Sequence, residues 1–211
     1  MSKQFLKDIA YEKIKERILQ GYYEEGSTSE NELVKELQMS RTPIREALQR
    51  LQYDGLVKIY SNQGVFFQDL SVKQVNDLFD MRIAIETFSL RKAVPVITSG
   101  QLEKLEQELT KQQKALDEQD PMAFMKNDAA FHSYLISLAD NQFIDPAFKN
   151  IRERLFHHGS LVYKKNPDLL RQSLQEHRKI VEAIQSNDVK AATWAMETHL
   201  ENSKKIELSC V

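Results

Sequence analysis

Interruptions of helical periodicity are rare along this chain. Its 211 residues include six glycines and five prolines, the two residue types that most often end or break a helix. Between these breaks, apolar residues recur three and four positions apart, as they do from Phe5 to Gln20, which is the pattern of a helix with one buried face. The chain is therefore predicted to be mainly α-helical.

Helix signals in the first seventy residues occur in a definite order. A second helix is expected to begin at Ser29, where Glu32 completes a capping box. A third is expected to begin at Ser40, after a tight turn, and to end before Gly55. Two short β-prone runs then suggest a hairpin, Leu56–Tyr60 and Val65–Gln68. Three helices followed by a β-hairpin predict a winged helix-turn-helix over residues 1–70.

The remainder of the chain, residues 71–211, carries no strand signal. Capping residues and Asp-Pro or Asn-Pro pairs mark the expected helix starts, among them Ser71, Thr98, Asp120, Asp145 and Asn187. The helices are expected at about 72–94, 99–118, 121–139, 145–163, 168–186 and 188–207. A second, all-α domain of six or seven helices is therefore predicted.

The charge balance gives little support to DNA binding when the chain is taken as a whole. Its formal net charge is −2, whereas nucleic-acid-binding domains are commonly basic. Residues 1–70 hold ten Lys/Arg and eleven Asp/Glu, so their net charge is only −1. Any DNA-binding surface must be local, such as Ser40–Gln52, where three arginines face one acid. No apolar run is long enough to span a membrane, and a single cysteine, Cys210, suits a reducing cytoplasm.

The helix that begins at Ser40 has the position of a recognition helix. In a helix-turn-helix, the first residues of the second helix enter the major groove. Arg41 and Arg45 are four residues apart, so both leave the same helical face, and an arginine can bind guanine through two hydrogen bonds. The candidate DNA-binding residues are Ser40, Arg41, Thr42, Arg45 and Arg50, together with Gln63 and Gly64 at the tip of the hairpin.

A second constellation lies in the helical domain. Asp128 and His132 are one helical turn apart, and His177 and His199 fall on two later helices. One carboxylate and three imidazoles suit zinc, nickel or another first-row divalent ion. The spacing alone leaves another interpretation open, because single histidines are more often packed or hydrogen-bonded than metal-bound.

The first seventy residues resemble the DNA-binding domain of the GntR family of bacterial repressors. The resemblance is carried by Ser29-Glu30-Asn31-Glu32-Leu33, by the run from Ser40 to Leu48, by Asp54-Gly55-Leu56-Val57 and by Gly64. It implies DNA contacts at Arg41, Thr42, Arg45 and the wing glycine. Many members have an arginine where this chain has Asn31, so the contact at that position is expected to differ.

Residues 71–207 are similar to the helical effector (FCD) domain of the FadR-type subfamily. The matching stretches are Arg82-Ile83-Ala84-Ile85-Glu86, Asp128-Ala129-Ala130-Phe131-His132, Glu176-His177 and Met196 with His199-Leu200. The resemblance implies that Asp128, His132, His177 and His199 bind a divalent metal on the floor of a pocket for a small carboxylate. Arg82 is the leading candidate for pairing with that carboxylate, and Tyr134, Asn141 and Arg152 are further candidate lining residues.

Other interpretations remain at this stage. Arg82 could instead form an ion pair with Glu86, worth only about 0.3–0.5 kcal/mol if exposed. The metal could serve a metal-dependent enzyme, although the sequence lacks a His-Glu-x-x-His helix, a nucleophile elbow and a phosphate loop. It could also be purely structural. The expectation that best fits both domains is a cytoplasmic, homodimeric regulator that binds a pseudo-palindromic operator and responds to an effector.

Overall fold

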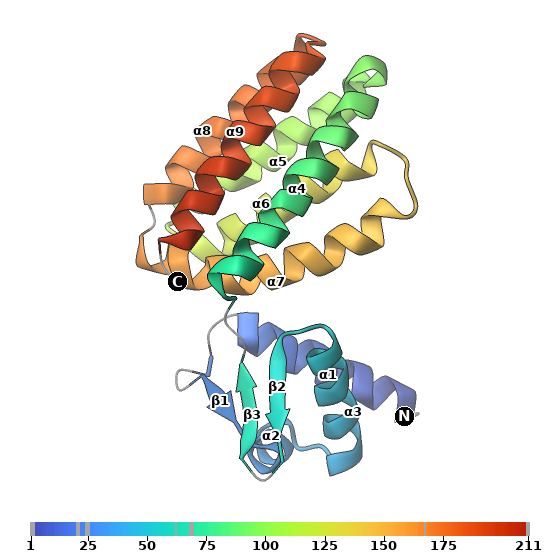
Figure 1. Ribbon diagram of the computed structural model, residues 1–211, viewed down its shortest axis with the longest axis vertical. Coiled ribbons are helices and arrows are strands. Elements are labelled where there is room, and N and C mark those ends of the chain that lie inside the picture. The colour runs from blue at the N-terminus through green and yellow to red at the C-terminus, as the bar shows by residue number, and fades with distance from the viewer. Residues whose placement is uncertain are drawn as a thin grey trace. The chain divides into compact units, whose positions relative to one another are not determined.

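The computed structural model describes residues 3–19, 22–23, 26–61, 63–67, 70–166 and 168–209. It divides the chain into two compact units, Met1–Asp69 and Leu70–Val211, which are drawn in Figure 1. Within the described residues it contains nine α-helices, one short 3-10 helix and three strands. No helix in that part of the chain is long and apolar enough to cross a membrane. Cys210 lies outside the described residues.

The N-terminal unit is the predicted winged helix-turn-helix. Its helices are α1 (Lys3–Leu19), α2 (Glu30–Leu37) and α3 (Arg41–Tyr53), and its hairpin consists of β2 (Val57–Tyr60) and β3 (Gly64–Phe67). The apolar faces of the three helices and the hairpin bury one common core, which includes Ile14, Leu33, Ile44, Leu51 and Val65. Burial of these side chains from every element fixes α3 against α1 and α2, with its polar face exposed.

The small sheet has a third strand that the sequence did not indicate. β1 (Ser27–Thr28) pairs antiparallel with β3, so that the strand order is β1-β3-β2. Two residues are too few to show an alternating pattern, which explains why the strand escaped prediction. Its effect is to bind the segment before α2 to the wing.

Helix capping follows the sequence at some positions and departs from it at others. The capping boxes expected at Ser29 and Ser71 are both present. Ser40 occupies the N-cap of α3, but within the described residues its side chain makes no capping hydrogen bond. Two expected starts were wrong. α7 begins at Ile144, ahead of Asp145, and Asn187 adopts a left-handed conformation (φ 51°), so that Asp188 caps α9 instead.

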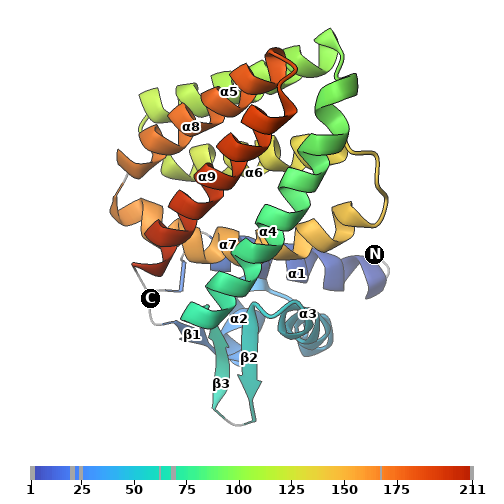
Figure 2. The ribbon, with the colours of Figure 1, turned by 45° about the horizontal axis from the view of Figure 1, so that its top comes forward.

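The C-terminal unit is the predicted helical bundle. Its elements are α4 (Val72–Ala93), the 3-10 helix η1 (Val94–Val96), α5 (Ser99–Asp117), α6 (Pro121–Ser137), α7 (Ile144–Lys165), α8 (Asp168–Gln185) and α9 (Val189–Leu208). α9 packs between α4 and α8, as Figures 1 and 2 show, and α5 packs against α6 and α8. Helices distant in sequence are thus brought together around one interior.

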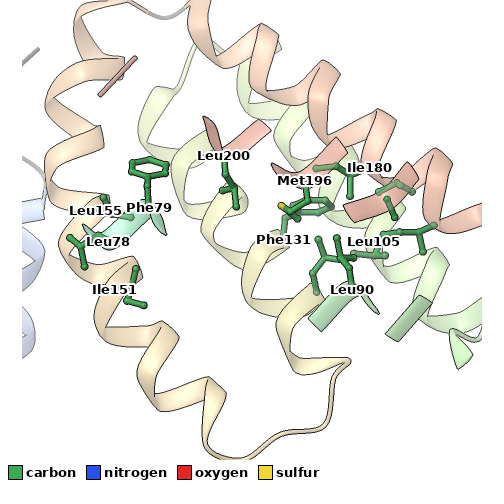
Figure 3. Close-up of a cluster of buried hydrophobic side chains, with 14 of the residues drawn as sticks. Leu78, Phe79, Leu90, Leu105, Phe131, Ile151, Leu155, Ile180, Met196 and Leu200 are labelled. Carbon is green, nitrogen blue, oxygen red and sulfur yellow. The ribbon is translucent and has the colours of Figure 1, made fainter. Parts of the chain in front are cut away.

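Apolar side chains from these helices interlock in that interior. Figure 3 shows Phe131 of α6 beside Met196 of α9 and Leu90 of α4, with Phe79, Leu155 and Leu200 further along the bundle. Phe131, Met196 and Leu200 are fully buried. Each follows or precedes a residue of the predicted metal group by one to three positions, so core packing holds that group in place.

Candidate functional site

The four predicted metal ligands come together inside the helical unit. Asp128 and His132 lie one turn apart on α6, whereas His177 comes from α8 and His199 from α9. One ligand atom of each histidine lies within 4.8 Å of those of the other two. Asp128 Oδ1 is 3.5 Å from His177 Nε2, and its Oδ2 is 4.0 Å from His132 Nε2. One carboxylate and three imidazoles therefore surround a common point.

The Nδ1 atom of each histidine is hydrogen-bonded to a side chain outside the predicted ligand set. His132 Nδ1 lies 2.5 Å from Glu86 Oε2. His177 Nδ1 is 2.8 Å from Gln112 Oε1, and His199 Nδ1 is 2.8 Å from Glu176 Oε2. These partner atoms are acceptors, so each Nδ1 carries the proton and each Nε2 carries a lone pair. A second partner of this kind is a usual feature of metal-bound histidine, because it fixes the ring and its tautomer.

The Nε2 atoms are left without suitable protein partners. His132 Nε2 is buried and has no hydrogen-bond partner among the described residues. The Nε2 atoms of His177 and His199 lie 3.2 Å apart, and two lone pairs at that separation repel each other. A cation among the three nitrogens would remove both the repulsion and the unmet hydrogen-bonding capacity.

Electrostatics favour neutral imidazoles at His177 and His199. Burial, together with the neighbouring His199 and His132, holds the pKa of His177 well below its ordinary value. Burial likewise lowers the pKa of His199. Neutral imidazole is the form that coordinates a metal. The residues therefore fit a divalent ion with three nitrogen donors and one oxygen donor, the set that zinc and nickel accept.

Glu86 links the histidine cluster to Arg82. Its carboxylate is fully buried, contacts His132 and accepts a hydrogen bond of 2.8 Å from Arg82 Nε. Burial alone would raise the pKa of Glu86, but Arg82 and His132 outweigh it and lower the pKa to about 2. Glu86 is thus a permanent anion that orients His132 and neutralises Arg82.

The sequence alone does not mark these three orienting residues as part of the site. Glu86 is visible only as a possible ion-pair partner of Arg82, and Glu176 only as the neighbour of His177. Gln112 carries no local signal at all, because it reaches His177 from α5, 65 residues away in the chain. Only the packing of α5 against α8 reveals it.

The partner of His177 can be tested directly. Gln112→Leu removes the acceptor of the Nδ1 proton while keeping a side chain of similar size. We expect zinc affinity to fall by about 10- to 100-fold, measured by competition with a chromophoric chelator. Gln113→Leu is the matched control, since Gln113 bonds Arg178 and Asp117 outside the cluster. Equal affinities of the two variants would remove Gln112 from the site.

A cavity of about 50 Å³ opens beside the histidines. Asp128, His132 and His199 line it, and Arg82 and Arg152 supply positive charge. This volume exceeds the roughly 10–15 Å³ that a single water requires, so the cavity has room for a small ligand. The other lining residues are Phe124, Met125, Ala129, Phe148, Leu155, Phe156, Tyr163, Leu170, Ser173, Ser203 and Glu207.

The candidate effector residues separate into two groups. Arg82 and Arg152 line the cavity, and Arg152 also donates a hydrogen bond to Ser133 Oγ. Tyr134 and Asn141 are not among its lining residues. The Tyr134 ring lies under Lys104 Nζ at 4.4 Å, and Asn141 Oδ1 accepts from the backbone of Phe143. The structure therefore offers no support for pocket roles for these two.

His158 lies outside the cluster. His158 is buried on α7, and its Nε2 is 3.3 Å from the carbonyl oxygen of Glu207. The side chain of His157 is not among those described. His158 is thus a packed histidine that joins α7 to the end of α9.

The N-terminal unit has its own concave surface. Arg41 and Arg45 of α3 line a groove with the start of α2 and with Gln63 and Gly64 of the wing. Both arginines are exposed, and both are engaged by neighbours. Arg45 Nε donates to Glu30 Oε2 at 2.7 Å, and Arg41 Nη2 donates to Asn31 Oδ1 at 3.1 Å. The two guanidinium groups are thereby positioned at one face of the recognition helix.

The other candidate DNA contacts are placed differently. Ser40 and Thr42 are exposed beside Arg41 at the start of α3. Arg50 does not line the groove. Its Nη1 is 3.3 Å from Asp8 Oδ1, and its guanidinium carbon lies 3.9 Å above the Tyr11 ring, so it packs onto α1.

Gly64 lies where the wing packs closely against β1. In the structure its φ is +118°, and a Cβ atom there would lie 2.9 Å from the carbonyl oxygen of Thr28. The close approach that excludes a side chain is therefore to β1 of the same unit.

Comparison with known proteins gives two family matches. Residues 6–67 match the model described as bacterial regulatory proteins, gntR family, and residues 77–202 match the FCD domain. The HTH-type transcriptional repressor RspR of Escherichia coli (strain K12) is 31% identical over 175 residues, which cover 82% of this chain and 75% of the relative.

Solved structures show the same fold. E. coli McbR/YncC superposes with a TM-score of 0.82 at 19% identity, covering 100% of this chain and 99% of the other. The metal-free FCD domain of TM0439 superposes with a TM-score of 0.56 at 22% identity, covering 67% of this chain and 96% of that domain.

Proposed function

Since the chain belongs to the GntR family of bacterial transcriptional regulators and carries an FCD effector domain, we propose that it is a metal-dependent repressor controlled by a small carboxylate. In this proposal it works in the bacterial cytoplasm as a homodimer. The dimer binds a pseudo-palindromic operator, because a two-fold protein matches a two-fold site.

The observation that supports this proposal most strongly is the shared wall between the histidine cluster and the cavity. Asp128, His132 and His199 belong to both. A divalent ion held by Asp128 and the three histidines would present positive charge to the cavity, where it supplies a binding point for an anionic oxygen. Zinc and nickel are the ions that the donor set favours.

The chain's own arginines complete the proposed carboxylate site. Arg152 reaches the cavity from α7 and can donate paired hydrogen bonds to a carboxylate. Arg82 also lines the cavity, but Glu86 already neutralises much of its charge. The two interpretations of Arg82 thus coexist, as an ion-pair partner and as a cavity residue. Arg152 is the stronger candidate for direct pairing with the effector.

Two alternatives to the proposed sensor are a metal-dependent enzyme and a protein whose metal is purely structural. The relatives of this chain are regulators rather than enzymes, so turnover of a carboxylate by the zinc-loaded protein would be needed to favour catalysis. In a purely structural site, Asp128→Asn would destabilise the fold. In the proposed sensor site, the variant keeps the fold and loses carboxylate binding.

The coupling between the two domains is the central test of the regulator. Operator DNA is first selected from a random duplex library with the metal-loaded protein. An acid that binds the FCD domain should then change operator affinity by about 5- to 150-fold. By linkage, operator DNA must change acid affinity by the same factor. Gel-shift titration measures the first and calorimetry the second. Operator affinity unaffected by every acid that binds would contradict the proposal.

A further inference from the structure

Glu207 is a cavity residue that neither the metal cluster nor the carboxylate site uses. It lies on the last turn of α9, beyond the 77–202 segment matched by the FCD model. Its exposed fraction is 4%, and its Oε2 atom is buried with no hydrogen-bond partner among the described residues. A carboxyl oxygen buried in this way costs free energy unless a partner arrives.

Glu207 lines the cavity two helical turns further along α9 than the predicted metal ligand His199. His199, Ser203 and Glu207 are spaced four residues apart, so they form one buried stripe on α9, and all three line the cavity. The helical rise separates the Cα atoms of His199 and Glu207 by about 12 Å. The cavity thus runs along α9 from the histidines to this carboxyl group.

The rest of the fold holds Glu207 in that place. A Cβ atom at Gly159 of α7 would lie 3.3 Å from Glu207 Oε1 and 3.3 Å from Met125 Cε. Glycine at this position therefore leaves the room that the carboxyl group occupies. His158 also contacts the Glu207 carbonyl oxygen from the same helix. The residues Gly159 and His158 thus place α7 directly against α9 at Glu207.

The surroundings of Glu207 are polar and suited to a hydroxyl group. Tyr163 and Ser203, which share a hydrogen bond, line the same part of the cavity. Burial raises the pKa of Glu207 to about 8; Arg82 opposes this rise and Asp128 adds to it. A hydroxyl both donates and accepts a hydrogen bond, so it can pair with this carboxyl group whether or not it is protonated.

We infer that Glu207 forms the second polar end of the effector cavity and selects a small acid with a hydroxyl remote from its carboxylate. This inference rests on the proposed carboxylate site. The acid's carboxylate lies at the end lined by His132, His199 and Arg152, and its hydroxyl meets Glu207. An acid without the hydroxyl leaves Glu207 buried and unpaired, which is the condition that gives hydrogen-bonding sites their selectivity.

Matched pairs of acids test the inference on the full-length, zinc-loaded protein. The probes are 3-hydroxypropanoate, 4-hydroxybutanoate and 5-hydroxypentanoate, each compared with propanoate, butanoate or pentanoate by calorimetry. For the chain length that spans the cavity, we expect the hydroxy acid to bind about 10- to 100-fold more tightly than its parent. Glu207→Leu should abolish this preference and strengthen binding of the parent acid.

Two further variants separate selectivity from folding. Glu207→Gln keeps a group that donates and accepts hydrogen bonds, so it should retain most of the hydroxyl preference. Glu197→Leu makes the same change as Glu207→Leu at an exposed position of α9 and should retain all of it. A preference that survives in Glu207→Leu overturns the inference, because a merely structural residue would change both affinities equally.

The outcomes also distinguish failure of the Glu207 inference from failure of the carboxylate site on which it rests. Equal binding of hydroxy and parent acids at all three lengths overturns the role of Glu207 and leaves the carboxylate site intact. Binding of neither series, with zinc or without it, overturns the carboxylate site itself and the role of Glu207 with it.

Discussion

His177→Ala is expected to abolish stoichiometric zinc binding. The unaltered protein should retain about one zinc per chain after dialysis, and the variant should retain background amounts, with affinity lowered by more than about 100-fold. The reason is that His177 contributes one of four donors and lies at the centre of the cluster, 3.2 Å from His199 and 3.5 Å from Asp128. Loss of His177 should lower zinc affinity by more than the loss of an orienting residue, which lowers it by about 10- to 100-fold.

Thermal unfolding gives an independent measure of the same change. Zinc at 100 times its dissociation constant should stabilise the unaltered protein by about 2.7 kcal/mol, whereas the His177→Ala variant should unfold at the same temperature with and without zinc. His158→Ala is the control, because His158 is a buried histidine outside the cluster. Normal zinc content in folded His177→Ala protein would refute the assignment of this ligand.

Arg45→Ala is expected to weaken specific DNA binding by about 1–3 kcal/mol. Arg45 is exposed one turn into the recognition helix, where its guanidinium can reach a base edge in the major groove. In the free protein it pairs with Glu30, so a DNA partner must replace that ion pair. Fluorescence anisotropy with the selected operator and with a scrambled duplex measures both the affinity and the sequence preference.

Arg50→Ala is the matched control for this experiment. It removes the same charge from the same helix, but Arg50 stacks on Tyr11 outside the groove. We expect its sequence preference to equal that of the unaltered protein. If Arg45→Ala also leaves operator affinity and preference unchanged, Arg45 does not read bases.

Local chemistry explains which parts of the fold the sequence could predict. A capping box depends on two residues three positions apart, so those at Ser29 and Ser71 were visible without the structure. Asn187 was misread because asparagine suits both a helix start and the left-handed residue that follows a helix. β1 escaped because its partner, β3, lies about 40 residues further along the chain.

In the candidate site, too, features that depend on neighbouring residues could be predicted, whereas contacts between distant segments could not. Spacing placed Asp128 and His132 on one helical face, but it could not bring His177 and His199 to them. That convergence depends on how α6, α8 and α9 pack, and only the family resemblance indicated it beforehand. Glu207 had neither local spacing nor resemblance to mark it. Its interest lies in burial without a partner, which is a property of the folded chain alone.

The pairing of β1 with the wing has a mechanical consequence for the groove. Thr28 pairs with Val65 and abuts Gly64, while the next residue, Ser29, caps α2. Main-chain hydrogen bonds therefore brace the wing against the start of α2, on opposite sides of the same groove. Main-chain pairing thus sets the spacing between the wing and α2, and we expect the groove to favour duplexes that deform easily to fit it. That component of sequence preference will persist when the groove's side chains are replaced one at a time.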